Sequence, residues 1–287
     1  MKKDVQIKET ENKKWPMTIL LLILGIAILV PLYMAFVIAI KQPSEMTNDI
    51  AGALALPKHW SLSNFTEAIR VTDFWHTAGN SLFITVCSVV ACVLVSSLIS
   101  YAIARNMQHK KIYKFFYYYL VSAMFVPFSM LMLPLVKQMA FFHLDNKIGV
   151  IFLYIVFNMA MNTLLYVGYL KNIPVSLEES AYIDGATTWG VFWRIIFPLL
   201  KPMHATVAVL TALAAWNDVL LPLVMLSGGD GKDTTLPLAQ MMFQSQFGTN
   251  YNLAFASYIL ALLPILVFYL IAQKQIINGV TNGAVKG

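Results

Sequence analysis

The sequence predicts an all-α integral membrane protein with six transmembrane helices and a short cytoplasmic helix between the fourth and fifth spans. Apolar residues make up 59% of the chain and charged residues only 12%, against about 25% charged residues in a soluble domain. The apolar residues form long runs without the alternating polarity of a membrane β-barrel. The net charge is +6, but basic residues lie between these runs and form no patch, which argues against a nucleic-acid partner.

Each apolar run supplies about 20 helical residues, enough to cross a hydrocarbon core about 30 Å thick. The first run carries no charge, is longer than the apolar core of a signal peptide and contains Pro31, so we take it as a retained helix. The chain then divides into a tail at 1–14, a transmembrane domain at 15–275 and a C-terminal tail at 276–287. The expected spans are 17–40, 80–104, 115–136, 148–170, 203–226 and 253–273.

The distribution of Lys and Arg predicts the orientation, because cytoplasmic loops carry an excess of positive charge. With the N-terminus inside, the cytoplasmic segments hold 14 of the 20 basic residues and the outside loops hold six. The aromatic residues at 115–119 begin the third span at the inner face, as an interfacial belt would. Both termini are therefore expected in the cytoplasm, with long loops outside at 41–79 and inside at 169–202.

The inside loop has the sequence pattern of a short amphipathic helix. Pro174 stops the preceding helix, and Ser176 with Glu179 three residues later has the pattern of a capping box, which starts a new helix at about Leu177. We expect Gly190 to end or bend this helix.

Small and acidic residues lie close together on this helix. Ala181 and Gly185 are four residues apart on one face, where another backbone could approach closely. A glycine inside a helix costs about 1 kcal/mol relative to alanine, which such an approach would explain. Glu178, Glu179 and Asp184 add acidic groups nearby. Two interpretations stay open for Glu179: contact with a partner and capping of the helix.

The loop resembles the coupling motif of ABC-type importer permeases, which reads Glu-Ala-Ala, three residues, Gly, nine residues, Ile, one residue and Leu-Pro. Ser180 and Phe197 depart from the family's Ala and Leu, but the spacing is intact. Four further stretches resemble carbohydrate-uptake permeases, and the last resembles the tail of the maltose-type second permease subunit: 56–61 with 64–65, 216–218 with 222–223, 236–237, and 279–287.

The resemblance implies a prokaryotic cell-membrane transporter for a sugar, in contact with lipid. A second, usually non-identical permease subunit would complete the pore, two ATPase subunits would bind below it, and an extracytoplasmic receptor would deliver the sugar. The short helix would then be the coupling helix that sits in a groove of an ATPase. The residues implied in this coupling are Glu178, Glu179, Ser180, Ala181, Asp184, Gly185, Ile195 and Pro198.

No phosphate-binding loop Gly-x-x-x-x-Gly-Lys-Ser/Thr is present in the chain. The nearest stretch, 228–232, is followed by Asp233 and has the pattern of an exposed turn. We therefore expect ATP and Mg on the partner ATPase subunits, and no cofactor or metal on this chain.

Polar residues recur every four positions along the fourth span, at Tyr154, Asn158, Asn162 and Tyr166. Such a stripe could line the pore and contact sugar hydroxyls and rings. It could equally form hydrogen bonds between helices, worth about 0.6 kcal/mol each.

Asp218, which follows Asn217, is the only formal charge within the six spans. An acid at the membrane centre costs about 2.5–3.5 kcal/mol on insertion scales, so Asp218 should face protein or water. It is either a gate or pathway residue or a structural contact with a neighbouring turn. His204 is expected to be interfacial, because no acid or nucleophile is spaced beside it.

Two other function classes are less consistent with the sequence. An ion-coupled secondary transporter often has internal repeats and several membrane carboxylates, whereas this chain has one such carboxylate and no evident repeat. A membrane-embedded enzyme would need a cluster of His, Asp, Glu or nucleophilic residues, which the sequence lacks.

Overall fold

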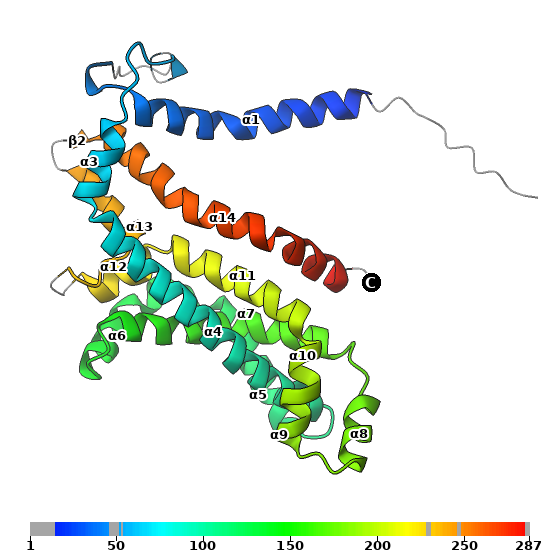
Figure 1. Cartoon of the computed structure of the whole chain (residues 1–287). Helices are drawn as coiled ribbons and strands as arrows, with labels where there is room; N and C mark the ends of the chain where they lie inside the picture. The colour runs from blue at the N-terminus through cyan, green and yellow to red at the C-terminus, as the bar shows by residue number, and fades with distance from the viewer. Residues whose placement is uncertain (1–14, 46–51, 53, 228–230, 246–247, 285–287) are drawn as a thin grey trace, which may run out of the picture.

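The structure, a computed structural model, describes residues 15–45, 52, 54–227, 231–245 and 248–284, which form an assembly of long helices (Figure 1). The expected tail at 1–14 and part of the turn at 228–232 lie outside the described residues. Within the described part, four helices are long and apolar enough to cross a membrane. They are α1 (Trp15–Ile40), α4 (Phe74–Asn106), α7 (Lys147–Leu170) and the Tyr251–Ile271 part of α14 (Tyr251–Ala284).

Two bent helix pairs raise the number of candidate spans to six if each pair is one span. The first pair bends by 104° and the second by 73°. The first consists of α5 (Lys111–Ser122) with η2 (Ala123–Phe125), followed by α6 (Phe128–Phe141). The second consists of α9 (Thr188–Val191), the π-helix η3 (Phe192–Ile196) and α10 (Phe197–Leu199), followed by α11 (Lys201–Asn217).

Short elements connect these helices. Two strands of two residues each pair in antiparallel fashion, so the described fold is helical apart from one small hairpin. The short elements are η1 (Pro43–Glu45), α3 (Ser63–Val71), α8 (Ser176–Ile183), α12 (Leu220–Leu226), α13 (Leu236–Ala239), η4 (Gln240–Phe243), β1 (Gln244–Ser245) and β2 (Gly248–Thr249).

Local sequence explains where α7 begins. Asn146 caps it, because its side-chain oxygen accepts hydrogen bonds from the N–H groups of Ile148 and Gly149 at 2.9 and 3.2 Å. Gly149 has no room for a side chain, since a Cβ there would lie 1.7 Å from the carbonyl oxygen of Leu144. The turn before α7 and the start of the helix are therefore fixed against each other.

The long helices pack in a defined order. α4 packs against α7 and α11, and the end of α1 meets the start of α14, from which the two helices diverge (Figure 1). The short helices α8 and α9 lie at one end of the molecule, and α3, α12 and α6 lie at the opposite end (Figure 1). A buried apolar cluster joins α4, α7, α8, η3 and α11 near the first end, so the short helix α8 shares a core with the long apolar helices.

Candidate functional site

The helix α8 begins without the capping box that the sequence pattern predicts. Its N-cap is Val175, which already has helical backbone angles and makes no side-chain cap hydrogen bond. The Val175 carbonyl accepts hydrogen bonds from the N–H groups of Glu178 and Glu179 at 2.9 and 3.1 Å. Ser176 therefore lies inside the first turn, where its hydroxyl cannot act as a cap, and the capping-box prediction is wrong.

The same helix ends at Ile183, and the glycine of its C-terminal cap is Gly185 and not Gly190. Gly185 has φ +82°, and its N–H donates to the Tyr182 carbonyl at 3.1 Å. The N–H of Ala186 reaches back to the Ala181 carbonyl at 2.9 Å, which completes a Schellman motif. Gly190 instead lies in α9, where its N–H donates to the Thr187 hydroxyl at 3.2 Å.

This ending changes the physical role of Gly185. The residue lies beyond the last turn of α8, so it does not share a helical face with Ala181. A Cβ at Gly185 would meet nothing within 4 Å in the described structure, so the backbone angle, and not close packing, explains the glycine. Ala181 is buried against its own subunit.

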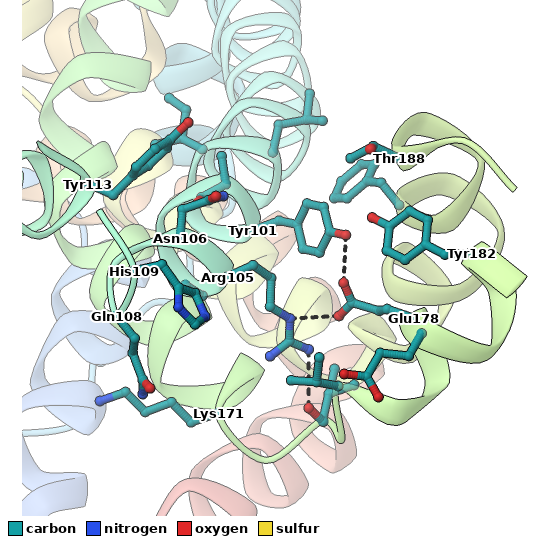
Figure 2. Close-up of a pocket in the computed structure, with 18 of the residues that line it drawn as sticks. Tyr101, Arg105, Asn106, Gln108, His109, Tyr113, Lys171, Glu178, Tyr182 and Thr188 are labelled. Carbon is teal, nitrogen blue, oxygen red and sulfur yellow. Dashed lines mark hydrogen bonds and ion pairs between the residues drawn. The ribbon is translucent and has the colours of Figure 1, made fainter. Parts of the chain in front are cut away.

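A buried acid ties α8 to the membrane helices (Figure 2). Glu178 is 4% exposed, although it lies on a helix outside the expected spans. One carboxylate oxygen accepts a hydrogen bond from the Tyr101 hydroxyl at 2.7 Å, and the other forms an ion pair with Nε of Arg105 at 2.6 Å. Both partners come from the last turns of α4. Position 178 of α8 is thus fixed to the end of a long apolar helix.

Arg105 also binds the end of α7. Its two terminal nitrogens donate to the carbonyls of Leu170 and Ile173, each at 3.1 Å. These carbonyls lie at and just after the end of α7, where helix carbonyls lack partners in the helix. A planar guanidinium can serve three acceptors in this way, whereas a lysine ammonium lacks the fixed fork. One side chain therefore connects α4, α7 and α8.

Sequence reasoning did not find Tyr101 or Arg105. Arg105 contributed only to the count of cytoplasmic positive charges, and Tyr101 belonged to an apolar run. The sequence does contain one signal: Arg105 is a basic residue one position beyond the expected second span. An unpaired charge so close to the membrane core is costly, so a partner could be expected for it. Its partner, 73 residues later in the chain, carries no local sequence signal.

The remaining residues of the predicted coupling set differ in exposure. Ile195 is partly buried. Beside α8 lies a pocket of about 1120 Å³, formed by the end of α4, Tyr113, Lys171 and residues of α8 and α9 (Figure 2). Two apolar side chains of α8 are also exposed, Leu177 in its first turn and Ile183 at its last residue. The exposed members of the set are Glu179, Ser180, Asp184, Gly185 and Pro198.

The polar stripe of α7 faces other helices of the same chain at three of its four positions. Tyr154, Asn162 and Tyr166 are at most 4% exposed, which favours the helix-contact interpretation for them. Asn158 is half-buried, and its amide donates to the Tyr154 carbonyl on its own helix at 2.8 Å. Asn217 on α11 is exposed and also bonds within its own helix.

Asp218 lies at the break between α11 and α12. One carboxylate oxygen accepts from the N–H of Leu220 at 2.9 Å, and the other accepts from the Tyr154 hydroxyl at 3.0 Å. The acid therefore faces protein, as its charge requires, and it satisfies an amide at the start of α12. The structure brings Tyr154 and Asp218 together, although no sequence pattern pairs these two residues.

Tyr166 pairs with His204 at the bend before α11. His204 Nε2 lies 2.9 Å from the Phe197 carbonyl oxygen, which can only accept, so this nitrogen carries the proton. In the neutral ring Nδ1 is then an acceptor, and the Tyr166 hydroxyl donates to it at 2.7 Å. His204 is partly buried between two elements and joins α7 to α10.

No group of three or more His, Cys, Asp or Glu side chains that could hold a metal ion occurs in the described part of the chain. The fold and this site define a membrane-spanning subunit with a short helix anchored at one end. Residues 94–281 match the family described as "Binding-protein-dependent transport system inner membrane component". The chain belongs to this family. It is a multi-pass membrane permease subunit of an ABC-type importer, in which separate subunits hydrolyse ATP.

Similar proteins agree with this assignment over the full chain length. The chain is 39% identical over 290 residues to the multiple sugar-binding transport system permease protein MsmG of Streptococcus mutans, with 100% of both chains covered. It is 34% identical to the probable starch degradation products transport system permease protein AmyC of Thermoanaerobacterium thermosulfurigenes, covering 98% of this chain and 100% of that protein.

A solved structure shares the fold. It is a bacterial ABC transporter involved in the import of the acidic polysaccharide alginate, with a TM-score of 0.77 and 23% sequence identity. The match covers 90% of this chain and 94% of that chain.

Proposed function

We propose that this subunit forms half of the translocation pore for a carbohydrate, in the class of oligosaccharides or glycosides. An extracytoplasmic receptor delivers the sugar, a second and non-identical permease subunit completes the pore, and two ATPase subunits supply the energy. Relatives named as sugar permeases support the substrate class. The related alginate transporter, described in complex with a pentasaccharide-bound periplasmic protein, supports the receptor.

The mechanism rests on one observation, the binding of Glu178 to Arg105 and Tyr101. A helix that receives force from an ATPase has to pass that force to the membrane helices. The Arg105 side chain supplies the link, because it holds α8, α4 and the end of α7 at one point. In this proposal α8 is the coupling helix, and its exposed residues, including Glu179 and Asp184, contact the ATPase.

Six spans with both termini in the cytoplasm fit this role, with a transmembrane domain at 15–275 between short tails. In this topology each bent helix pair counts as one span. The start of α1 and the end of α14 point toward the end of the molecule where α8 and α9 lie, which supports the orientation (Figure 1). Among the polar residues, Asn158, Asn217 and Asp218 are the pathway candidates, because they are not fully buried.

Transport by the reconstituted complex tests the proposal. The chain, its sister permease, the ATPase and the receptor are placed in vesicles with a panel of labelled sugars. We expect uptake of one sugar class that depends on ATP and on the receptor, and no ATP hydrolysis by this chain alone. Uptake driven by an ion gradient without ATP would instead support the secondary-transporter alternative.

The orientation has its own test in intact cells. A cysteine at Ser61 should react with a membrane-impermeant maleimide added outside, and a cysteine at Ser176 should not. Labelling at position 176 from outside would overturn both the orientation and the coupling role of α8.

A further inference from the structure

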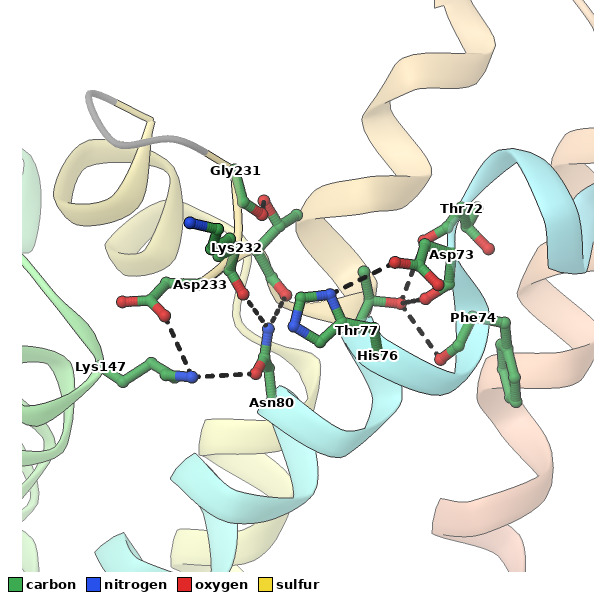
Figure 3. Close-up of polar contacts among 11 residues, drawn as sticks. Thr72, Asp73, Phe74, His76, Thr77, Asn80, Lys147, Gly231, Lys232 and Asp233 are labelled. Atoms are coloured by element: carbon green, nitrogen blue, oxygen red, sulfur yellow. Dashed lines mark hydrogen bonds and ion pairs between the residues drawn. The ribbon is translucent and has the colours of Figure 1, made fainter.

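At the end of the molecule opposite α8, a polar cluster joins three segments that are far apart in the sequence (Figure 3). Its centre is Asn80 on α4, which is only 6% exposed. The Asn80 amide nitrogen donates to the carbonyls of Lys232 and Thr234 at 2.8 and 2.9 Å. Its side-chain oxygen accepts from Lys147 at 3.1 Å. Every hydrogen-bonding group of this side chain is therefore used.

Lys147 completes the cluster. It is the first residue of α7, where a positive charge is unfavourable because the helix dipole is positive at its N-terminus. Its ammonium group lies 3.0 Å from a carboxylate oxygen of Asp233, with about a third of each side chain exposed. The ion pair and the Asn80 bond compensate for the unfavourable position. The positive charge of Lys147 is therefore compensated by Asp233 of the 231–234 turn and by Asn80.

The segment that follows the turn is anchored in the core. The N–H of Leu236 donates to the Ser81 hydroxyl of α4 at 2.9 Å. The Leu236 side chain is fully buried in an apolar cluster with Phe74 and Trp216. Releasing the segment would expose this leucine and leave the Asn80 amide without its carbonyls, so the arrangement is costly to open.

We propose that Asn80 and Lys147 are positioning residues, which keep the 231–236 segment as a fixed part of the outer surface throughout the transport cycle. The proposal rests on the proposed function, because it places this segment on the side where the receptor delivers sugar. The segment does not act as a gate. Movements of α4 and α7 carry it along, so its position relative to these helices stays constant while the pore opens and closes.

Thiol labelling of the purified complex in detergent tests the positioning role. In a background without Cys87 and Cys92, a cysteine replaces Thr235, which is 4% exposed. Slow maleimide labelling is expected in the parent. Asn80→Asp, which cannot donate to the two carbonyls, should raise the labelling rate by about tenfold or more through local opening.

Matched variants separate the cluster from general destabilisation. Lys147→Met should accelerate labelling of the cysteine at 235, and Lys147→Arg should restore slow labelling because it keeps the ion pair. Lys137→Met removes an exposed charge from the neighbouring helix α6 and should have no effect. Unchanged labelling in both Asn80→Asp and Lys147→Met would overturn the positioning role.

Cross-linking in two nucleotide states tests the fixed position. Cysteines replace His76 on α4 and Lys232 in the turn, whose side chains form none of the Asn80, Lys147 and Asp233 contacts that hold the segment (Figure 3), and a bifunctional thiol reagent is applied to nucleotide-free and vanadate-trapped complexes. Single-cysteine variants with a monofunctional reagent correct for access. Rates that agree within about twofold are expected for a site that stays closed. A rate lower by about tenfold in one state would show a gate and overturn the proposal. Failure of vanadate trapping would instead count against the proposed ABC function, and the labelling at position 235 would still test the positioning role.

Discussion

Tyr154 on α7 donates a hydrogen bond of 3.0 Å to Asp218 at the break between α11 and α12. This bond pairs a residue of the polar stripe with the single acid of the expected spans, and it explains how that acid is tolerated. The second carboxylate oxygen serves the start of α12. The two residues connect α7 to the end of α11 and the start of α12, which favours the structural interpretation of Asp218.

Replacing Tyr154 by Phe should therefore destabilise the subunit. A hydrogen bond to a charged group contributes about 1.5–3 kcal/mol, and Tyr154→Phe removes the donor while leaving the acid in place. Tyr118→Phe is the matched control, since it removes the hydroxyl of an exposed tyrosine. Thermal unfolding of the purified complex should show a lower Tm for Tyr154→Phe than for Tyr118→Phe. The reverse order would contradict this role of the bond.

The Arg105–Glu178 pair should show strong coupling in a double-mutant cycle. Removing one partner of a buried ion pair costs about 3–5 kcal/mol, because it leaves the other charge unpaired. Arg105→Met and Glu178→Leu should each lower stability and ATPase retention, and the double variant should be less impaired than their sum. Glu179→Leu, on the exposed face of α8, is the control for stability. Additive effects of the two single changes would contradict an energetic link between α4 and α8.

The substitutions at Gly185 should rank by their tolerance of a positive φ angle. Asn adopts the left-handed region more readily than Ala, for which it costs about 1–2 kcal/mol. We expect ATPase retention in the order Gly185, Gly185→Asn, Gly185→Ala, measured at equal membrane levels. Gly185→Asp is informative beside Asn, because both fit the backbone and only one adds charge. If Asn and Asp both abolish retention, side-chain bulk at the ATPase contact is decisive and the backbone explanation is insufficient.

Two glycines of α7 should respond differently to alanine. Gly149→Ala would force a Cβ against the Leu144 carbonyl at 1.7 Å, so the turn before α7 has to move. Gly168→Ala meets nothing within 4 Å in the described structure and gains up to about 1 kcal/mol of helix propensity. The yield of folded protein from size-exclusion chromatography should fall for Gly149→Ala only. Equal yields would show that the turn is more pliable than its geometry indicates.

Much of the helical framework could be predicted because membrane helices are encoded by local composition. Apolar runs of sufficient length locate α1, α4, α7 and α14, and the coupling motif locates α8. The ends of the helices were harder to predict than their existence. α4 begins at Phe74 and not near residue 80, because its first turns are too polar for the apolar pattern. The break at Asp218 could not be foreseen from hydropathy, which averages over the whole run.

The contacts that define the site depend on residues distant in sequence. Arg105 meets Glu178, and Asn80 meets Lys147 and the 231–234 turn, through the packing of α4 on α7. No local pattern encodes such pairs. The capping box failed for a different reason: Ser176 and Glu179 have the right spacing, but the turn at Val175 starts the helix one residue earlier. The spacing of Ser176 and Glu179 carries no information about the backbone angles of Val175, the residue before them.

The 104° bend between η2 and α6 bears on how this subunit is accommodated in a bilayer. Pro127 supplies no N–H at the bend, so the ladder of backbone hydrogen bonds is interrupted there. Hydrocarbon chains offer no replacement, and such a break is tolerated only against protein or water. Phe125, next to the bend, is 84% exposed and apolar, which suits a protein surface better than water. The broken backbone at this bend therefore has to lie against protein or water in a bilayer, because lipid alone does not satisfy it.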